Sequence, residues 1–223
     1  MVWHTDQEKS QLNGHNGHHL NGQNGHNAHS IVELSRVELP KKEVDYAKLL
    51  ELGRELLVAL GENPDREGLE DTPRRWADWW REFIEYDPGK TDTSFSSSSS
   101  GQLVCVSGMR VWTLCEHHLL PFYCDVSIGY ITGERVLGLS KFARIAHQFA
   151  HQLQIQERLG QQIADEVCRL TGTEDVAVLL KGEHLCMSAR GIRTPGLMTS
   201  SIMRGAFQQD YEKRMEFLTL IKQ

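Results

Sequence analysis

The sequence lacks the features of several large protein classes. No apolar run in its 223 residues approaches the length needed to cross a bilayer, and the N-terminus MVWHTDQEK has no apolar signal-peptide core. The five cysteines are an odd number and lack the spacing of a disulfide framework. We therefore expect a cytoplasmic protein without a membrane partner. In a reducing compartment, neighbouring Cys and His more often indicate a metal or catalytic site.

An excess of positive charge is also missing. The formal net charge of -6 argues against a general partner role for nucleic acid or acidic membranes, although one local basic pocket is still allowed. Apolar residues make up 39% of the chain and charged residues 24%, which favours a globular protein with a polar extension.

Three parts of the chain differ in composition. Residues 1–40 are rich in Asn, Gly and His and have little to bury, which predicts a disordered tail. Leucines at helical spacing predict a helix over 45–60, and we assign residues 41–95 to an N-terminal helical part. Residues 96–223 are expected to form the catalytic domain.

Beyond the serine run at 96–100 the apolar period changes. Alternating or continuous apolar runs predict strands over 103–106, 111–114, 123–131 and 176–187. Helical periodicity predicts helices over 141–151, 156–170 and 210–222, and Gly172 is the predicted stop of the second of these. This order of elements predicts an α+β fold with an antiparallel sheet.

Two short stretches carry metal-ligand residue types. Cys115 and His118 are three residues apart, and His184 and Cys186 are two apart on a predicted strand, so both should point to one face. Zinc takes thiolate and imidazole ligands in a tetrahedron, and Cys115, His118 and Cys186 would leave its fourth position open, as in catalytic sites. His117 and His184 would then be free for proton transfer. A structural site with His184 as the fourth ligand is the alternative.

Four cationic side chains suggest an anion pocket. Ser140 is a natural N-cap for the helix that follows, whose free N–H groups suit an anion. Lys141 and Arg144 share one face of that helix, and Arg190 and Arg193 follow the second metal stretch. Such a group suits a polyphosphate, although ordinary solvated Lys and Arg would have the same sequence.

Two residues at the start of the next helix could recognise a purine base. Gln156 and Glu157 open the predicted helix. A Glu at this position usually interacts with the helix dipole, and it could equally accept hydrogen bonds from the N–H groups of a purine. The sequence leaves these two roles open.

Several long motifs together closely resemble type I GTP cyclohydrolase. They are, in order, ENPDREGLEDTPRR, CEHHLLPF, GLSKFARI, QIQERLGQQIA and EHLCMSARGIR. The resemblance runs from about Leu49 to the C-terminus, and the stretch 194–207 matches more loosely than the rest.

The resemblance implies a tunnelling fold, an antiparallel sheet with helices packed on one face, assembled as a homodecamer of two stacked pentamers with active sites at subunit junctions. It implies a zinc-dependent hydrolase acting on cyclic amidines. This enzyme opens the guanine imidazole ring of GTP, releases formate and forms 7,8-dihydroneopterin triphosphate, the first step of folate and tetrahydropterin biosynthesis.

The resemblance also assigns roles to residues. By motif match, the zinc ligands are Cys115, His118 and Cys186. The catalytic residues are His117, placed at the ribose ring oxygen, His184, placed at the purine nitrogen, and Ser140. The triphosphate clamp comprises Ser140, Lys141, Arg144 and Arg190. Gln156 and Glu157 resemble the readers of the guanine base.

Overall fold

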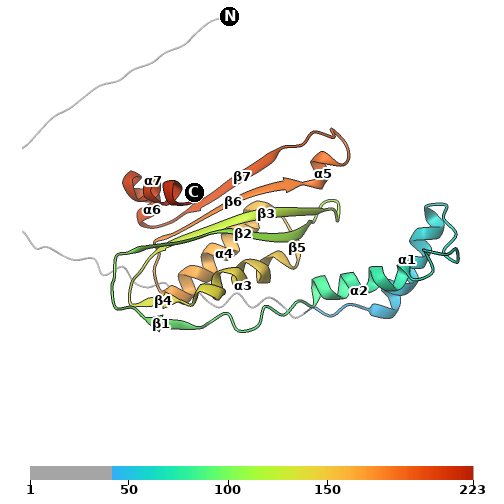
Figure 1. Ribbon diagram of the computed structural model, residues 1–223, viewed down its shortest axis with the longest axis horizontal. Coiled ribbons are helices and arrows are strands. Elements are labelled where there is room, and N and C mark those ends of the chain that lie inside the picture. Colours follow the sequence, from blue (N-terminus) through green and yellow to red (C-terminus); the bar gives the residue numbers. More distant parts are fainter. Residues whose placement is uncertain (1–41, 223) are drawn as a thin grey trace, which may run out of the picture. The chain divides into compact units, whose positions relative to one another are not determined.

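The computed structural model describes residues 42–222. The tail predicted to be disordered, 1–40, lies outside the described residues. From residue 42 onward, two helices precede a set of strands, and further helices alternate with the remaining strands (Figure 1). The α+β fold class is confirmed. No helix within 42–222 is long and apolar enough to cross a membrane.

Two helices precede the sheet, α1 (Tyr46–Ala59) and α2 (Thr72–Ile84). The Asp45 side chain caps α1 by accepting from the backbone N–H three residues on, at 2.9 Å. Pro73 lies in the first turn of α2, where its missing N–H leaves no hydrogen bond unmade. A Cβ on Gly53 would lie 3.1 Å from the Pro73 Cα, so glycine permits the two helices to cross closely.

A five-stranded sheet in the order β5-β2-β3-β6-β7 organises the rest of the described chain. Its strands are β2 (Leu103–Cys115), β3 (Pro121–Ile131), β5 (Leu153–Gln154), β6 (Val176–His184) and β7 (Leu197–Met203). Every neighbouring pair is antiparallel except β2 and β5. The sheet is thus antiparallel as predicted, with one short parallel edge.

Strand β2 is a single strand, so the prediction of separate strands over 103–106 and 111–114 was wrong. Its pairing with β3 shifts register between Val106 and Met109. Gly108 there has φ +74°, a conformation that glycine adopts without strain. The irregularity breaks the apolar pattern of the sequence while both halves stay paired to β3.

Helices α3 (Leu139–Ala150) and α4 (Gln156–Thr171) lie together on one face of the sheet (Figure 1). Their buried side chains meet alternate residues of β6 in the main core, including Phe142, Ile145, Phe149, Leu159, Ile163, Val176, Val178 and Leu180. Gly172 ends α4 in the left-handed conformation, as predicted.

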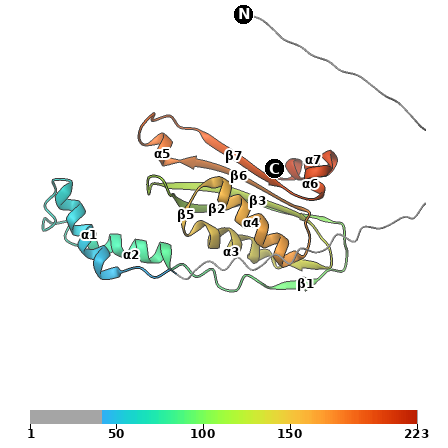
Figure 2. The ribbon, with the colours of Figure 1, turned by 180° about the vertical axis from the view of Figure 1, so that it is seen from behind.

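The C-terminal helices α6 (Ala206–Gln209) and α7 (Tyr211–Leu220) pack on the opposite face (Figure 2). They form a second buried cluster, whose fully or nearly buried members are Ala177, Leu179, Phe207 and Phe217. Successive strand residues point to opposite faces, so one strand, β6, supplies both cores. The face opposite α3 and α4 is therefore partly covered as well.

Two short strands, β1 (Ser94–Ser96) and β4 (Arg135–Leu137), pair antiparallel outside the main sheet. The predicted boundary between residues 95 and 96 falls inside β1. The division into a helical part over 41–95 and a catalytic domain over 96–223 stays a prediction.

An aromatic cluster joins the end of α2 to the end of α3. The rings of Tyr86 and His151 stack with centroids 3.7 Å apart, and Phe83 lies 5.3 Å from His151. His151 Nδ1 donates to the His147 carbonyl at 2.7 Å. Burial lowers the pKa of both histidines, only partly offset at His151 by that hydrogen bond and by Glu82. Burial therefore favours the neutral form of both imidazoles in the folded protein.

We expect acidification to weaken this cluster. Both histidines have folded pKa values below the ordinary value of 6.5, so the unfolded chain binds more protons and the stability falls as the pH drops below 6.5. The variant His151→Phe keeps the ring stack and removes one titrating group. Between about pH 7.5 and about pH 5.5, its melting temperature should therefore fall less than that of the wild type. Equal decreases would contradict this origin of the pH dependence.

Candidate metal centre

The turn between β2 and β3 presents Cys115 and the two histidines that follow it. The Cys115 N–H donates to the Leu120 carbonyl at 2.9 Å, and the Leu119 N–H donates to the Cys115 carbonyl at 2.9 Å. Leu119 adopts φ +53°, an uncommon conformation for a residue with a side chain. The closed turn leaves His117 and His118 exposed at the end of the strand.

The register of the sheet brings the second stretch to the same place. Phe122, at the start of β3, pairs with His184, at the end of β6. The strand predicted over 176–187 ends at His184, and Cys186 lies in the one-turn helix α5 (Leu185–Ser188). The prediction that His184 and Cys186 share one strand face was therefore wrong, because the chain coils between them.

Three donors come together at this edge of the sheet. One ligand atom each from Cys115, His118 and Cys186 lies within 4.8 Å of the other two. Cys115 is buried, Cys186 partly buried and His118 exposed, so the group opens toward solvent on one side. The Nδ1 atom of His118 is 3.8 Å from the Cys115 Sγ. His184 is not a member of this group.

The chemistry of the three donors fits a metal ion. Two sulfurs and one imidazole nitrogen match the ligand types of zinc, and tetrahedral bonds of about 2.3 Å place two sulfurs about 3.8 Å apart. Burial, and then the neighbouring Cys115 sulfur, raise the pKa of the Cys186 thiol. A bound cation would offset the repulsion between two thiolates. The three residues could therefore hold a metal ion.

Two further imidazoles flank the donors. The Nδ1 of His117 lies 3.6 Å from the Cys115 Sγ on the exposed side. His184 stacks on Phe122 with centroids 4.2 Å apart and planes 10° apart. Burial lowers the pKa of His184, against an opposing effect of the Glu157 charge. The neutral form of His184, able to accept a proton, is thereby favoured.

The residues at the start of α4 are placed differently from each other. Gln156 is 1% exposed, and its Oε1 lies 3.0 Å from the Nε2 of His184. Glu157 is exposed in the first turn of the helix. Its carboxylate is open to an external donor, whereas the amide of Gln156 is engaged by the protein itself.

The cations assigned to one clamp fall into two groups. The Nζ of Lys141, itself buried, donates to the Lys90 carbonyl at 2.6 Å, and Arg144 donates to the Pro88 carbonyl. Arg190 lies instead beside the metal donors, with its Nη1 2.9 Å from the Nε2 of His118. The linker between α2 and β1 thus supplies the partners of the first group.

Ser140 is not the N-cap of α3, contrary to prediction. Gly138 holds that position, and Ser140 is exposed in the first turn. The helix begins one residue before Ser140 because Gly138 already has the extended conformation of a cap.

The start of α3 and the metal donors lie at opposite ends of the sheet. The Leu137 N–H donates to the Tyr130 hydroxyl, which fixes the start of α3 beside Tyr130. Phe122, next to the metal donors, lies eight residues from Tyr130 along β3, or about 26 Å. Within one chain, the structure does not bring Lys141 to the side of Cys115.

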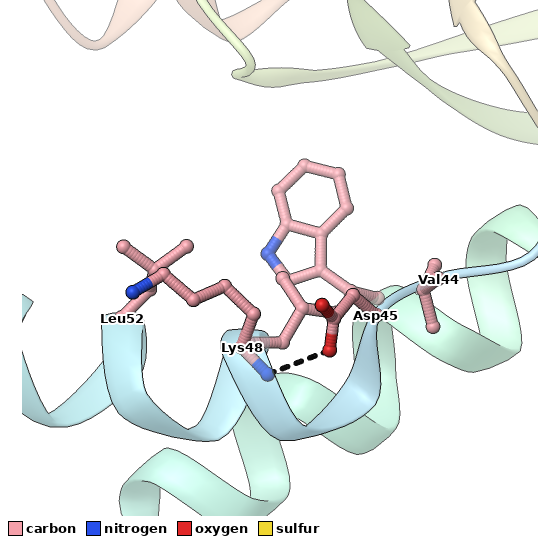
Figure 3. A pocket seen from close by; sticks show the side chains of 6 residues that line it. Val44, Asp45, Lys48 and Leu52 are labelled. Atoms are coloured by element: carbon pink, nitrogen blue, oxygen red, sulfur yellow. Dashed lines mark hydrogen bonds between the residues drawn. The ribbon is translucent and has the colours of Figure 1, made fainter.

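One apolar pocket of about 300 Å³ lies between α1 and α2 (Figure 3). It is lined by Val44, Asp45, Lys48, Leu49, Leu52 and Trp80. None of the predicted site residues lines it, and its walls offer little polar surface to orient a ligand. The metal donors, and not this pocket, are the candidate site.

Sequence reasoning missed one residue that contacts His184 and one that contacts its partner Gln156. Phe122 was part of an apolar run, and its stacking role needs the β3–β6 register. Ser200, on β7, accepts a hydrogen bond from the Nε2 of Gln156 at 3.0 Å. The run 197–203 carries β-branched and apolar residues between polar ones, a signal that could have predicted this strand.

Comparison with known proteins identifies the family. A family model described as GTP cyclohydrolase I matches residues 50–222. The GTP cyclohydrolase 1 of Hyperthermus butylicus is 43% identical over 180 residues, covering 80% of this chain and 92% of that protein. That of Aquifex aeolicus is 41% identical over 180 residues, covering 80% and 98%. With this extent of similarity over the part that carries the metal donors, the chain belongs to the GTP cyclohydrolase I family.

Proposed function

We propose that this protein is a zinc-dependent GTP cyclohydrolase of the cytoplasm. It converts GTP and one net water into formate and 7,8-dihydroneopterin triphosphate, the entry to folate or tetrahydropterin biosynthesis. The observation that carries the proposal is the meeting of Cys115, His118 and Cys186 with two spare imidazoles beside them. A purely structural metal site has no need of those imidazoles.

The zinc ion would be held by Cys115, His118 and Cys186. When bound, it supplies Lewis-acid activation of water for attack on C8 of the guanine. His184, whose pKa burial lowers, exchanges a proton at the purine nitrogen as the imidazole ring opens. His117, exposed on the outer side, serves proton transfer at the ribose ring oxygen before the sugar rearranges.

Recognition of GTP is divided between the base and the triphosphate. The exposed carboxylate of Glu157 accepts from the N–H edge of the guanine. The triphosphate is bound by Ser140, Lys141, Arg144 and Arg190. Charged phosphate oxygens are stronger acceptors than the neutral carbonyls that Lys141 and Arg144 now contact.

The complete site requires a second copy of this chain. Ser140 and Lys141 lie near Tyr130, about 26 Å along β3 from the edge that holds the metal donors, and one nucleotide is too short to contact both. A neighbouring subunit can supply the clamp for the metal centre of this one. This supports a homo-oligomer with its sites at subunit junctions, for which we propose a decamer of two pentamers.

Turnover of GTP tests the proposed function. The purified protein should release formate and an oxidisable fluorescent pterin from GTP, and His184→Ala should abolish both while the oligomer still assembles. The alternative, a nucleotide-binding relative with a structural metal, predicts GTP binding without formate. Wild-type turnover by His184→Ala would reject the assigned role of that imidazole.

Metal content tests the donors directly. We expect about one zinc per subunit in the wild type and a large loss in Cys115→Ser and Cys186→Ser, because an alcohol is a poor zinc ligand. Cys105→Ser is the matched control, since Cys105 lies at the other end of β2. Zinc is measured by elemental analysis alongside activity before and after chelation. Full zinc content in Cys186→Ser would show that the ion is bound elsewhere.

Mixed oligomers test the shared site. Cys115→Ser and Lys141→Ala are each expected to be inactive, because each removes one half of every site. Subunits of both kinds, unfolded and reassembled together, should regain measurable turnover, since some junctions then pair an intact metal centre with an intact clamp. Each variant reassembled alone is the control. Mixtures as inactive as the separate variants would mean that both halves belong to one chain.

A further inference from the structure

Both the nitrogen and the oxygen of the Gln156 side-chain amide are hydrogen-bonded within the protein. Its Nε2 faces three acceptors, the carbonyls of Leu180 and Met198, at 3.3 and 3.1 Å, and the Ser200 Oγ at 3.0 Å, which share its two N–H hydrogens. Carbonyl oxygens can only accept, so the amide nitrogen must face β6 and β7. The Oε1 of Gln156 therefore faces the other way, toward His184.

This orientation determines the tautomer of His184. The Oε1 of Gln156 accepts a hydrogen bond from the Nε2 of His184 at 3.0 Å, so that ring nitrogen carries the proton. A neutral imidazole has one N–H, which leaves Nδ1 as the nitrogen with the free lone pair. The parallel stack on Phe122 fixes the plane of the same ring.

The sheet contains a space shaped for this side chain. A Cβ on Gly182 would lie 2.5 Å from the Gln156 Oε1 and 2.7 Å from the Tyr123 carbonyl, closer than real atoms approach. Gly182 pairs with Met198 on β7, and Leu180 pairs with Ser200. Three elements, α4, β6 and β7, thus converge on one amide.

We propose that Gln156 and Ser200 are positioning residues, which hold His184 as the Nε2-protonated tautomer with Nδ1 directed to the reaction. Gln156 is then not a reader of the guanine base, because its N–H hydrogens go to β6 and β7 and its Oε1 accepts from His184. This inference rests on the proposed function and adds β7, through Ser200, to the machinery of the site.

The two roles of Gln156 predict different kinetics. A positioning residue acts on the transition state through His184, so its loss lowers kcat and leaves KM nearly unchanged. A reader of the base contributes to binding of the ground state, so its loss raises KM. A misplaced catalytic group can cost on the order of 100-fold in rate, so the two results are easily told apart.

The test uses Gln156→Met, which keeps the length of the side chain and removes its hydrogen bonds. We expect kcat for GTP to fall about tenfold or more with KM within about twofold. Ser200→Ala should lower kcat in the same direction by a smaller factor. Solvent-facing Gln161→Ala on α4 and Ser201→Ala on β7 are the matched controls and should leave both constants unchanged. Zinc content and oligomer size are measured for every variant.

Binding of GTP provides a readout without turnover. Zinc-loaded His184→Ala and the double variant His184→Ala, Gln156→Met should bind GTP with Kd values within about twofold by calorimetry, because Gln156 acts only through the missing imidazole. A double variant that binds at least about tenfold more weakly, or a rise in KM at unchanged kcat in Gln156→Met, would overturn the positioning role. Absence of formate from the wild type would instead overturn the proposed function. If Gln156→Met fails to assemble, Ser200→Ala decides by the same kcat and KM criteria.

Discussion

The pairing of β3 with β2 on one side and with β6 on the other is the interaction on which the site depends. It brings together a turn that follows Cys115 and a strand end that precedes Cys186, two segments far apart in the sequence. The register also sets Phe122 directly against His184. A slip of one residue would turn every side chain of β6 to the opposite face. Because both faces of β6 are buried in separate cores, such a slip is strongly disfavoured.

The sequence predicted well what has a local cause. The leucine period gave the first helix because helix formation follows the pattern of apolar residues over a few turns. Gly172 marked the end of α4 because a left-handed cap favours glycine at that single position. The donors Cys115 and His118 could be paired from their spacing, and the structure places them beside Cys186. Each of these inferences depends only on residues that are close together in the sequence.

What the sequence did not predict is decided by contacts between distant segments. Cys186 lies on a helical turn and not on β6, a change that the apolar run through residue 187 conceals. Ser140 has the composition of a cap, yet α3 begins after Gly138, where the chain leaves its pairing with β1. Gln156 is polar at the start of a helix, and only the folded sheet buries it against Ser200. In each case the local pattern allows more than one structure.

In the proposed function, the hydrogen bond between the largely buried Lys141 and the linker connects assembly to the chemistry of the site. A buried charge is costly unless it is hydrogen-bonded, and the linker carbonyl of Lys90 supplies that bond in the single chain. In the proposed function, a triphosphate bound at a subunit junction replaces neutral acceptors with anionic ones, which favours release of the linker. Lys141 and Arg144 would then have hydrogen-bond acceptors in both conditions, the backbone carbonyls in the isolated subunit and the phosphate oxygens in the assembly. Under the proposed function, backbone acceptors therefore hold the cations of α3 in place until a neighbouring subunit brings its metal donors and the nucleotide.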